Sequence, residues 1–230
     1  MEGYLIIPKV KQIRIGIVRV ITTSNKELLE SHGKLIKEYF TGIKLEVRSD
    51  CILGFPEGLH TEEDEIKSIP NIVQTGKSLI EQFKIDTLII SCVADPGVKE
   101  LQKELQIPVI GAGSAAASLA LLIGKPIGVL GITDEPPRII SSMLQNQLVA
   151  YAKPEGVKTT LDINKAIDTY IDIAKELVAR KGAETILLAC TGFSTARLAP
   201  ILERTLNAIV IDPIVASGII AYYTARGNSL

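Results

Sequence analysis

Two cysteines, Cys92 and Cys190, are the residues of this sequence best suited to chemistry. Each follows a short apolar run and precedes a stretch with helical spacing, so each is expected at the carboxyl end of a strand, the edge where open α/β sheets bind ligands. The N-terminus of the following helix would stabilise a thiolate and lower the thiol pKa from about 8.5 toward neutrality. A thiolate on one face of an acidic carbon can remove a proton while a thiol on the other face returns one. The pair therefore suits inversion of a stereocentre without a metal or an organic cofactor.

An internal repeat places the two cysteines in register. The segment DTLIISCVADPGVKELQKEL matches ETILLACTGFSTARLAPILERTL, and IGIV at 15–18 matches IGVL at 127–130. A duplicated unit with a pseudo-twofold axis would bring the two thiols face to face across a cleft. A single free cysteine is more often a small buried hydrophobe, and Cys51, which has no counterpart in the repeat, is expected to be inert.

Apolar runs rich in Ile and Val alternate with longer amphipathic stretches. Because the runs are continuous, they predict strands covered on both faces, as in parallel sheets between layers of helices. The expected strands are 13–20, 44–49, 86–92, 108–113, 126–133, 184–190 and 208–213. The expected helices are 25–40, 62–83, 96–106, 114–124, 136–151, 162–181, 196–206 and 214–226. This pattern predicts an α/β fold of two pseudo-symmetric subdomains, each a four-stranded parallel sheet flanked by helices, with the active site in the cleft between them.

The composition excludes several classes of protein. The chain has 25 Lys and Arg against 26 Asp and Glu, so it lacks the basic excess of a nucleic-acid-binding protein. Its apolar stretches are too short for a membrane span or carry Asp and Pro, and the N-terminal MEGYLIIPKVK does not resemble a signal peptide. Three cysteines favour a reducing cytoplasm over a disulfide framework. Since His32 and His60 are the only histidines, neither a Ser-His-Asp triad nor a multi-histidine metal site is expected.

The motifs SCVADPG and ACTGFS, with the opening strand IRIGIVRVITT, resemble the aspartate/glutamate/hydantoin racemase superfamily, and within it the hydantoin racemase branch. The Asp-Pro after the first cysteine resembles that branch. Two features depart from it: Val20-Ile21-Thr22-Thr23 stands where the branch usually has an Asn-Pro-Asn-like turn, and Ala189 stands where it usually has a Gly before the second cysteine. The resemblance implies a cofactor-independent racemase or epimerase with Cys92 and Cys190 as acid and base. It implies a small-molecule substrate with a carbonyl or carboxylate next to the reacting carbon, and it leaves room for a homo-oligomer. It also implies a first half of residues 1–107 plus 208–230 and a second half of residues 108–207, with approximate boundaries.

Several other residues are candidates for substrate binding, and each has an ordinary structural explanation. A charge within an apolar strand, Arg19, could bind an anionic group at the cleft mouth or pair with a structural carboxylate. Thr22 and Thr133 could supply hydroxyl contacts or satisfy local backbone. The backbone N–H groups after the second cysteine suit a carboxylate or a ring carbonyl. The candidate set is Arg19, Thr22, Val93, Ala94, Thr133, Thr191, Gly192 and Phe193. Asp95, which precedes Pro96, could be mechanistic or could cap a helix.

Three alternatives remain open from the sequence. An aspartate/glutamate-type amino-acid racemase would share the two thiols. A non-catalytic small-molecule sensor could keep the two-lobed clamp. The stretch GAGSAA at 111–116 follows a strand and opens a helix, as a dinucleotide fingerprint does, so an NAD(P)-dependent oxidoreductase is a third alternative. Against the oxidoreductase, the strand is the fourth of the chain and the matching repeat segment, DPIVAS, lacks glycines.

Overall fold

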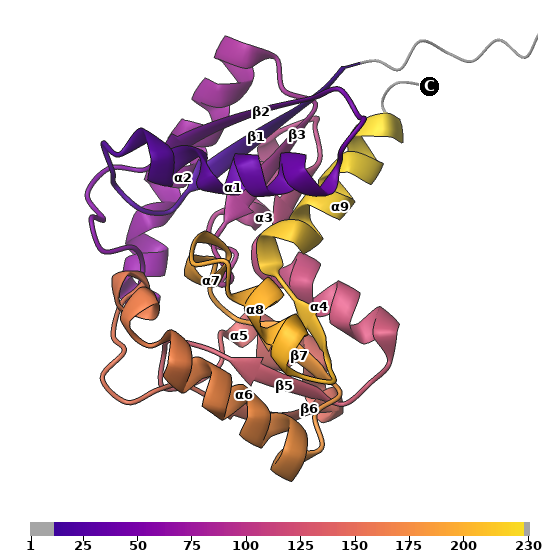
Figure 1. Cartoon of the computed structure of the whole chain (residues 1–230). Helices are drawn as coiled ribbons and strands as arrows, with labels where there is room; N and C mark the ends of the chain where they lie inside the picture. Colours follow the sequence, from indigo (N-terminus) through magenta and orange to yellow (C-terminus); the bar gives the residue numbers. More distant parts are fainter. Residues whose placement is uncertain (1–11, 228–230) are drawn as a thin grey trace, which may run out of the picture.

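The computed structural model describes residues 12–227, and the N-terminal segment considered above lies outside this range. Figure 1 shows two lobes, one made by the indigo-to-magenta part of the chain with the yellow C-terminal helix, the other by the pink-to-amber part. Each lobe contains one four-stranded parallel sheet. The predicted α/β class with two similar subdomains is confirmed.

The first sheet has the strand order β2-β1-β3-β4, and its strands are β1 (Ile13–Arg19), β2 (Leu45–Cys51), β3 (Thr87–Ser91) and β4 (Val109–Gly111). Its two faces are covered by α1 (Lys26–Tyr39) with α9 (Pro213–Gly227), and by α2 (Glu62–Phe83) with α3 (Val98–Glu104). Successive side chains of β1 serve the two faces in turn: Ile17 packs toward α1 and α9, and Val18 packs toward α2 and α3. Burial on both faces explains why the run IRIGIV is apolar without strict alternation.

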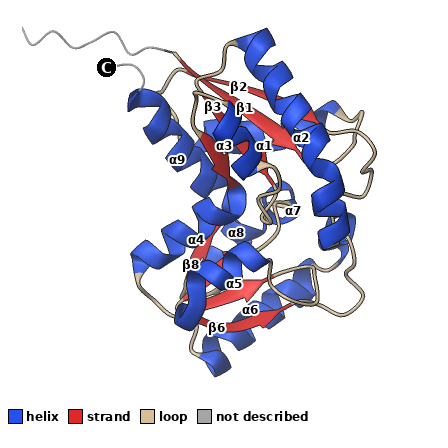
Figure 2. Ribbon diagram, turned by 180° about the vertical axis from the view of Figure 1, so that it is seen from behind, coloured by secondary structure: helices blue, strands red, loops and turns tan. Residues whose placement is uncertain are grey.

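The second sheet repeats this plan with the strand order β6-β5-β7-β8. Its strands are β5 (Ile127–Leu130), β6 (Leu148–Ala152), β7 (Thr185–Leu188) and β8 (Ile209–Ile211). One face is covered by α6 (Ile167–Lys181) and α8 (Leu198–Thr205), and the other by α4 (Ala112–Ile123) and α5 (Arg138–Leu144). The view from behind in Figure 2 shows the strands of both lobes enclosed by helices.

The chain crosses between the lobes at two helices. Helix α4 follows β4 of the first sheet but packs its buried alanines on the second sheet, and α9 follows β8 of the second sheet but packs on the first. The strands divide differently from the predicted halves, because β4 pairs with β3 and β8 pairs with β7. The expected boundaries 108 and 208 therefore put two strands in the wrong lobe, while the C-terminal helix does complete the first lobe. Strand pairing is not local in sequence, so the crossover could not be placed from apolar runs alone.

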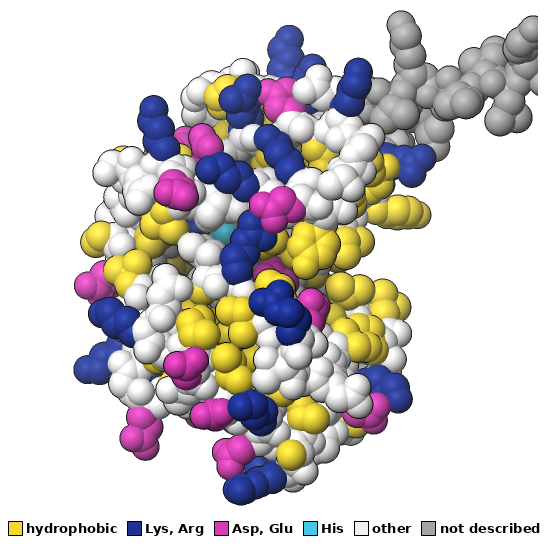
Figure 3. All heavy atoms as spheres, viewed as in Figure 1, with side chains coloured by type: hydrophobic (Ala, Val, Ile, Leu, Met, Phe, Trp, Pro, Cys, Tyr) yellow, Lys and Arg dark blue, Asp and Glu magenta, His cyan; other side chains and the backbone are white. Residues whose placement is uncertain are grey.

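Two other local expectations are corrected. The expected helix 136–151 ends at Leu144, and Leu148–Ala152 forms β6 at the edge of the second sheet. The expected helix 196–206 is preceded by a four-residue turn of helix, α7 (Gly192–Thr195), directly after the second cysteine. No helix within residues 12–227 is both long and apolar enough to cross a membrane. Figure 3 shows Lys and Arg interspersed with Asp and Glu over both lobes of the visible face, in keeping with the balanced charge count.

Candidate active site

A cavity lies between the lobes at the carboxyl ends of the central strands. The first lobe lines it with the segments after β1 and β3, the 58–60 loop and the first turn of α2. The second lobe lines it with the segments after β5 and β7 and with residues 160–164, most of a 3-10 turn. Cys92 and Cys190 both belong to this lining. The repeat therefore brings one thiol from each lobe to a single cavity, at the sheet edge where α/β folds bind ligands.

The two cysteines occupy matching but unequal positions. Cys92 comes one residue after β3 and is partly buried, whereas Cys190 comes two residues after β7 and is 7% exposed. The backbone N–H of Gly192 donates a hydrogen bond to Cys190 Sγ at 3.4 Å. A side-chain Cβ at Gly192 would lie 2.7 Å from Ile163 Cδ1, so a larger residue would require the Ile163 side chain to move.

Burial raises the pKa of both thiols. The pKa of Cys190 rises to about 11, opposed by hydrogen bonds from the N–H groups of Gly192 and Phe193. The pKa of Cys92 rises further, because burial is opposed by the N–H of Ala94 alone and a negative charge on Cys190 would add to the rise. The expectation of a lowered pKa is wrong for the free protein: α3 begins at Val98, well past Cys92, and the helix after Cys190 has only four residues. Burial thus favours the protonated form of both thiols, and a charge on Cys190 would act on Cys92.

Of the eight predicted binding residues, six line the cavity: Arg19, Val93, Ala94, Thr133, Thr191 and Gly192. Thr191 also joins the lobes, because its hydroxyl donates to the carbonyl of Ser91, next to Cys92, at 3.2 Å. The hydroxyl of Thr133 donates to the carbonyl of Glu135 at 2.6 Å. The remaining two residues have structural positions. Thr22 holds the loop after β2, with its hydroxyl donating to Ile52 O and accepting from Phe55 N, both at 2.8 Å. The ring of Phe193 is fully buried against Tyr170, with centroids 4.8 Å apart.

Arg19 is a buried cation at the edge of the cavity. Its Nη1 donates to the carbonyls of Leu28 and Leu29 in α1, at 2.6 and 3.2 Å, and to the Ser31 hydroxyl at 3.2 Å. Burial lowers its pKa to about 10. These hydrogen-bond partners are carbonyls and a hydroxyl. The contacts therefore do not support the alternative that Arg19 pairs with a structural carboxylate. A positive charge with this environment remains available to an anionic or carbonyl group in the cavity.

Asp95 caps a helix other than the one that follows it. Its Oδ1 and Oδ2 accept hydrogen bonds from the backbone N–H groups of Gly113 and Ser114, at 2.7 and 2.8 Å, at the start of α4. The glycines of GAGSAA permit this contact, since a Cβ at Gly111 would clash with the Asp95 carboxylate and one at Gly113 would lie 1.9 Å from Val93 O. The N–H groups that a dinucleotide pyrophosphate would need are thus bound by a carboxylate of the chain itself. This argues against the oxidoreductase alternative.

The sequence analysis did not assign a role to three further residues, of which two line the cavity and the third lies behind it. His32 of α1 is fully buried, with Nδ1 2.9 Å from the Ser91 hydroxyl and Nε2 2.9 Å from the Thr195 hydroxyl, so it ties the Cys92 segment to the helix after Cys190. His60 and Glu65 line the cavity from the loop before α2 and from its first turn. In sequence, His32 is distinguished only by its helical spacing from apolar residues such as Leu28 and Leu35. Glu65 belongs to an acidic run typical of any helix start.

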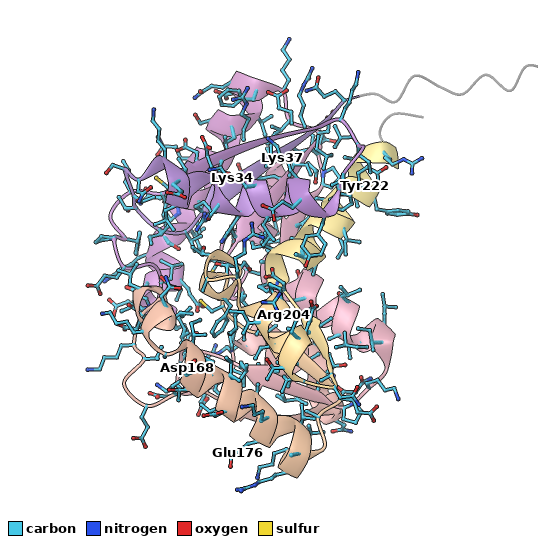
Figure 4. The ribbon with its side chains drawn as sticks, in the orientation of Figure 1. Lys34, Lys37, Asp168, Glu176, Arg204 and Tyr222 are labelled. Carbon is cyan, nitrogen blue, oxygen red and sulfur yellow. The ribbon has the colours of Figure 1, made fainter. Side chains whose placement is uncertain are left out.

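Among residues 12–227, no group of three or more His, Cys, Asp or Glu is arranged to hold a metal ion. Charged side chains gather elsewhere, on the outer helices. Figure 4 labels examples on α1 and α6, including Lys34, Lys37, Asp168 and Glu176.

Comparison with known proteins identifies the family. The family described as Asp/Glu/Hydantoin racemase matches residues 23–217. A hydantoin racemase of Paenarthrobacter aurescens is 28% identical over 180 residues, covering 72% of this chain and 75% of that protein. A hydantoin racemase of Rhizobium meliloti is 26% identical over 204 residues, covering 83% and 79%.

Solved structures share the fold. An allantoin racemase from Klebsiella pneumoniae superposes with a TM-score of 0.81 at 20% identity, covering 94% of this chain and 89% of that chain. A glutamate racemase from Thermus thermophilus superposes with a TM-score of 0.62 at 14% identity, covering 95% and 82%. The predicted superfamily and the prediction of a racemase-type isomerase are confirmed, and the chain belongs to the Asp/Glu/hydantoin racemase family.

Proposed function

We propose that this protein is a cofactor-independent racemase of a cyclic ureide of the hydantoin class, with Cys92 and Cys190 as its acid–base pair. The observation that carries the proposal is the convergence of two thiols, from equivalent strand ends of the two lobes, on one cavity. Burial raises the pKa of Cys92 most, and a negative charge on Cys190 adds to the rise, so the two thiols of this cavity interact electrostatically.

The reaction needs one proton removed and one proton supplied. The thiolate form of one cysteine takes the hydrogen from the ring carbon next to the carbonyl, and the C–H electron pair moves onto the carbonyl oxygen as an enolate. The thiol of the other cysteine then protonates the same carbon from the opposite face, and the enolate electrons return to form the new C–H bond. The two sulfurs have exchanged protonation states, and proton exchange with solvent restores them. Either cysteine acts as the base, depending on the hand of the substrate.

The raised pKa values of the two thiols affect both their strength as bases and how readily they ionise. A buried thiol becomes a strong base once ionised, and positioned acid–base groups contribute about 10²–10⁴-fold to a rate. The backbone N–H groups of Ala94 and Gly192 support a thiolate on their respective sulfurs. Because burial raises the pKa of both thiols, substrate binding has to favour the ionisation of one of them.

The cavity lining favours a neutral ring over a zwitterion. Apart from Arg19, His60 and Glu65 it consists of apolar side chains, small hydroxyl or amide side chains, the two thiols and backbone. A hydantoin has neither a carboxylate nor an ammonium group, whereas a free amino acid has both and would need a charged partner for each. The curated relatives are hydantoin racemases, which supports the same choice. The opposite charges of Arg19 and Glu65 favour the alternative of an amino-acid racemase, so free amino acids belong in the test.

The test is solvent deuterium exchange at the reacting carbon together with loss of optical rotation, over a panel of hydantoins and free amino acids. Wild-type protein is expected to racemise a hydantoin and to place solvent deuterium on the inverted carbon. Cys92→Ser and Cys190→Ser are expected to lose racemisation, and Cys51→Ser, outside the cavity lining, is the matched control that keeps it. Full racemisation by either active-site variant would exclude the two-thiol mechanism. Turnover of amino acids alone would replace the substrate class, and binding without turnover would favour the sensor.

A further inference from the structure

His60 is a cavity-lining side chain whose ring has no hydrogen-bond partner among residues 12–227. Both ring nitrogens, Nδ1 and Nε2, are buried, and neither has a hydrogen-bond partner among the described residues 12–227. The other histidine, His32, has a hydroxyl 2.9 Å from each of its ring nitrogens. Buried polar groups without partners are rare in native proteins, and each calls for an explanation such as a missing ligand.

Hydrogen bonds hold the backbone that carries this ring. The His60 N–H and the Thr61 N–H both donate to Asp64 Oδ2, at 3.3 and 3.2 Å, and Thr61 and Asp64 together form the capping box of α2. The side chain therefore extends from a fixed helix start and not from the middle of a long loop. Because the backbone at His60 is already ordered, binding a ligand through this side chain does not incur the cost of ordering a loop.

The ring lies where the two lobes meet. A Cβ built on Gly58 would be 3.8 Å from His60 Cε1 and 3.7 Å from the side chain of Thr160. His60 and Thr160 therefore both lie next to Gly58. Thr160 opens the 3-10 segment with which the second lobe lines the cavity. The side chain that carries the unpartnered nitrogens thus belongs to the lining of the cavity that also contains both thiols.

We propose that His60 is a specificity-determining residue that hydrogen-bonds the ureide edge of the substrate ring; this rests on the function proposed above. A neutral imidazole presents one donor and one acceptor. A ring ureide offers N–H groups and carbonyl oxygens and can satisfy both, whereas a carboxylate only accepts and an alkyl substituent does neither. The bound ring supplies to His60 the partner that the chain does not.

The experiment pairs a variant with a modified substrate. In His60→Phe, which keeps a ring of similar size but cannot hydrogen-bond, we expect KM for a 5-alkylhydantoin to rise about tenfold with kcat little changed. Wild-type protein should discriminate by a similar factor against the N1-methyl or the N3-methyl derivative, and His60→Phe should lose that discrimination. His60→Asn and His60→Gln place an amide near the positions of the two ring nitrogens, and one of them should recover part of the affinity. An unchanged KM in His60→Phe, or an equal loss for every substrate, would overturn the proposal.

Thermal unfolding separates recognition from structure. Because the His60 nitrogens are unpartnered in the free protein, His60→Phe should keep or raise Tm, whereas His32→Phe should lower it. A fall in Tm for His60→Phe equal to that for His32→Phe would mean that the ring is structural and would overturn the proposal.

Binding measured without turnover keeps the two proposals distinguishable. Calorimetric titration of the Cys92→Ser protein with a 5-alkylhydantoin, with and without His60→Phe, reports recognition alone. Binding that weakens about tenfold with His60→Phe supports the role of His60 even if wild-type protein fails to racemise the compound. No binding of any hydantoin by the Cys92→Ser protein would overturn the role of His60.

Discussion

The two lobes place their cysteines at equivalent strand ends but surround them differently. Cys190 receives two backbone N–H groups, from Gly192 and Phe193, and its pKa rises to about 11. Cys92 receives one, from Ala94, and negative charge on Cys190, Glu65 and Asp95 would each raise its pKa further. The duplicated topology thus fixes where the sulfurs lie, and burial raises the pKa of both, while the turn after each strand contributes to the difference between them. Of the two thiols, Cys190 is the easier to deprotonate.

The largest expected effect tests this inequality with single-thiol variants. Racemisation should fall by about 10²–10⁴-fold in both Cys92→Ser and Cys190→Ser, because each removes one of two required proton-transfer groups. Exchange of the substrate proton without inversion should survive better in Cys92→Ser, which keeps the more easily ionised thiol. Its rate should rise with pH toward about 11, since exchange requires the thiolate. In Cys190→Ser, exchange should require a higher pH.

Removing one thiol should also change the pKa of the other. A charge on Cys190 is among the causes that raise the pKa of Cys92, so Cys190→Ser should lower the pKa of Cys92 relative to wild type. The pKa of Cys92 should stay above that of Cys190 because burial, the largest cause in both, is opposed by one backbone N–H at Cys92 and by two at Cys190. Thiolate absorbance against pH, with Cys51→Ser as the background, measures these values. Equal exchange rates and equal titration in the two variants would mean that the lobes are chemically equivalent.

The next effect concerns the group that joins the lobes. Burial, and then the charge of Arg19, lower the pKa of His32 well below its ordinary value, so the folded protein keeps it neutral. The unfolded chain binds a proton there below about pH 6.5. The stability that His32 contributes is therefore present above about pH 6.5 and is lost as the pH falls, by up to about 1.4 kcal/mol per pH unit.

Urea unfolding at a series of pH values checks this expectation. His32→Phe should remove most of the acid slope and, because the hydroxyls of Ser91 and Thr195 lose their partner, should lower stability near neutral pH by about 1–3 kcal/mol. Lys34→Ala, an exposed change on the same helix, should keep the slope. A slope unchanged by His32→Phe would assign the acid sensitivity to other groups.

The contrast between the lobes also shows what the sequence can and cannot predict. The register of Cys92 with Cys190, and the central strands β3 and β7, were predictable because buried parallel strands carry continuous apolar runs and the repeat preserves them. The strand Leu148–Ala152 was missed because it is a partly exposed edge strand that directly extends a helical pattern.

Properties that depend on the folded environment were the ones predicted wrongly or not at all. The pKa of a thiol at a strand end depends on burial, which outweighs the expected helix dipole at Cys92 and Cys190. That His60 has no partner becomes visible only once every neighbour has been placed. Asp95 was predicted as a possible cap for the helix that follows it, but its partners lie 18 and 19 residues further along the chain.

The smallest expected effect compares the two carboxylates that cap the crossover helices. At α4, the two oxygens of Asp95 accept one backbone N–H each, from Gly113 and Ser114. At α9, Asp212 Oδ1 alone accepts from the hydroxyl of Ser194 and from two backbone N–H groups, at 2.7 to 3.1 Å. Asparagine retains one acceptor oxygen and replaces the other by an NH₂ donor.

In Asp95→Asn the new NH₂ donor therefore faces one of the two backbone N–H donors, and that hydrogen bond is lost. The free energy of unfolding should fall by about 1–2 kcal/mol. Asp212→Asn can keep every recorded hydrogen bond on its single oxygen, and its effect should stay within about 0.5 kcal/mol. Urea unfolding at one pH near neutrality measures both variants side by side. Equal losses would show that the negative charge at the helix start matters more than the number of acceptor atoms, since both substitutions remove the same charge. An unequal loss in the expected direction would show that the two lobes have solved the same capping problem with different geometry, as they have for their thiols.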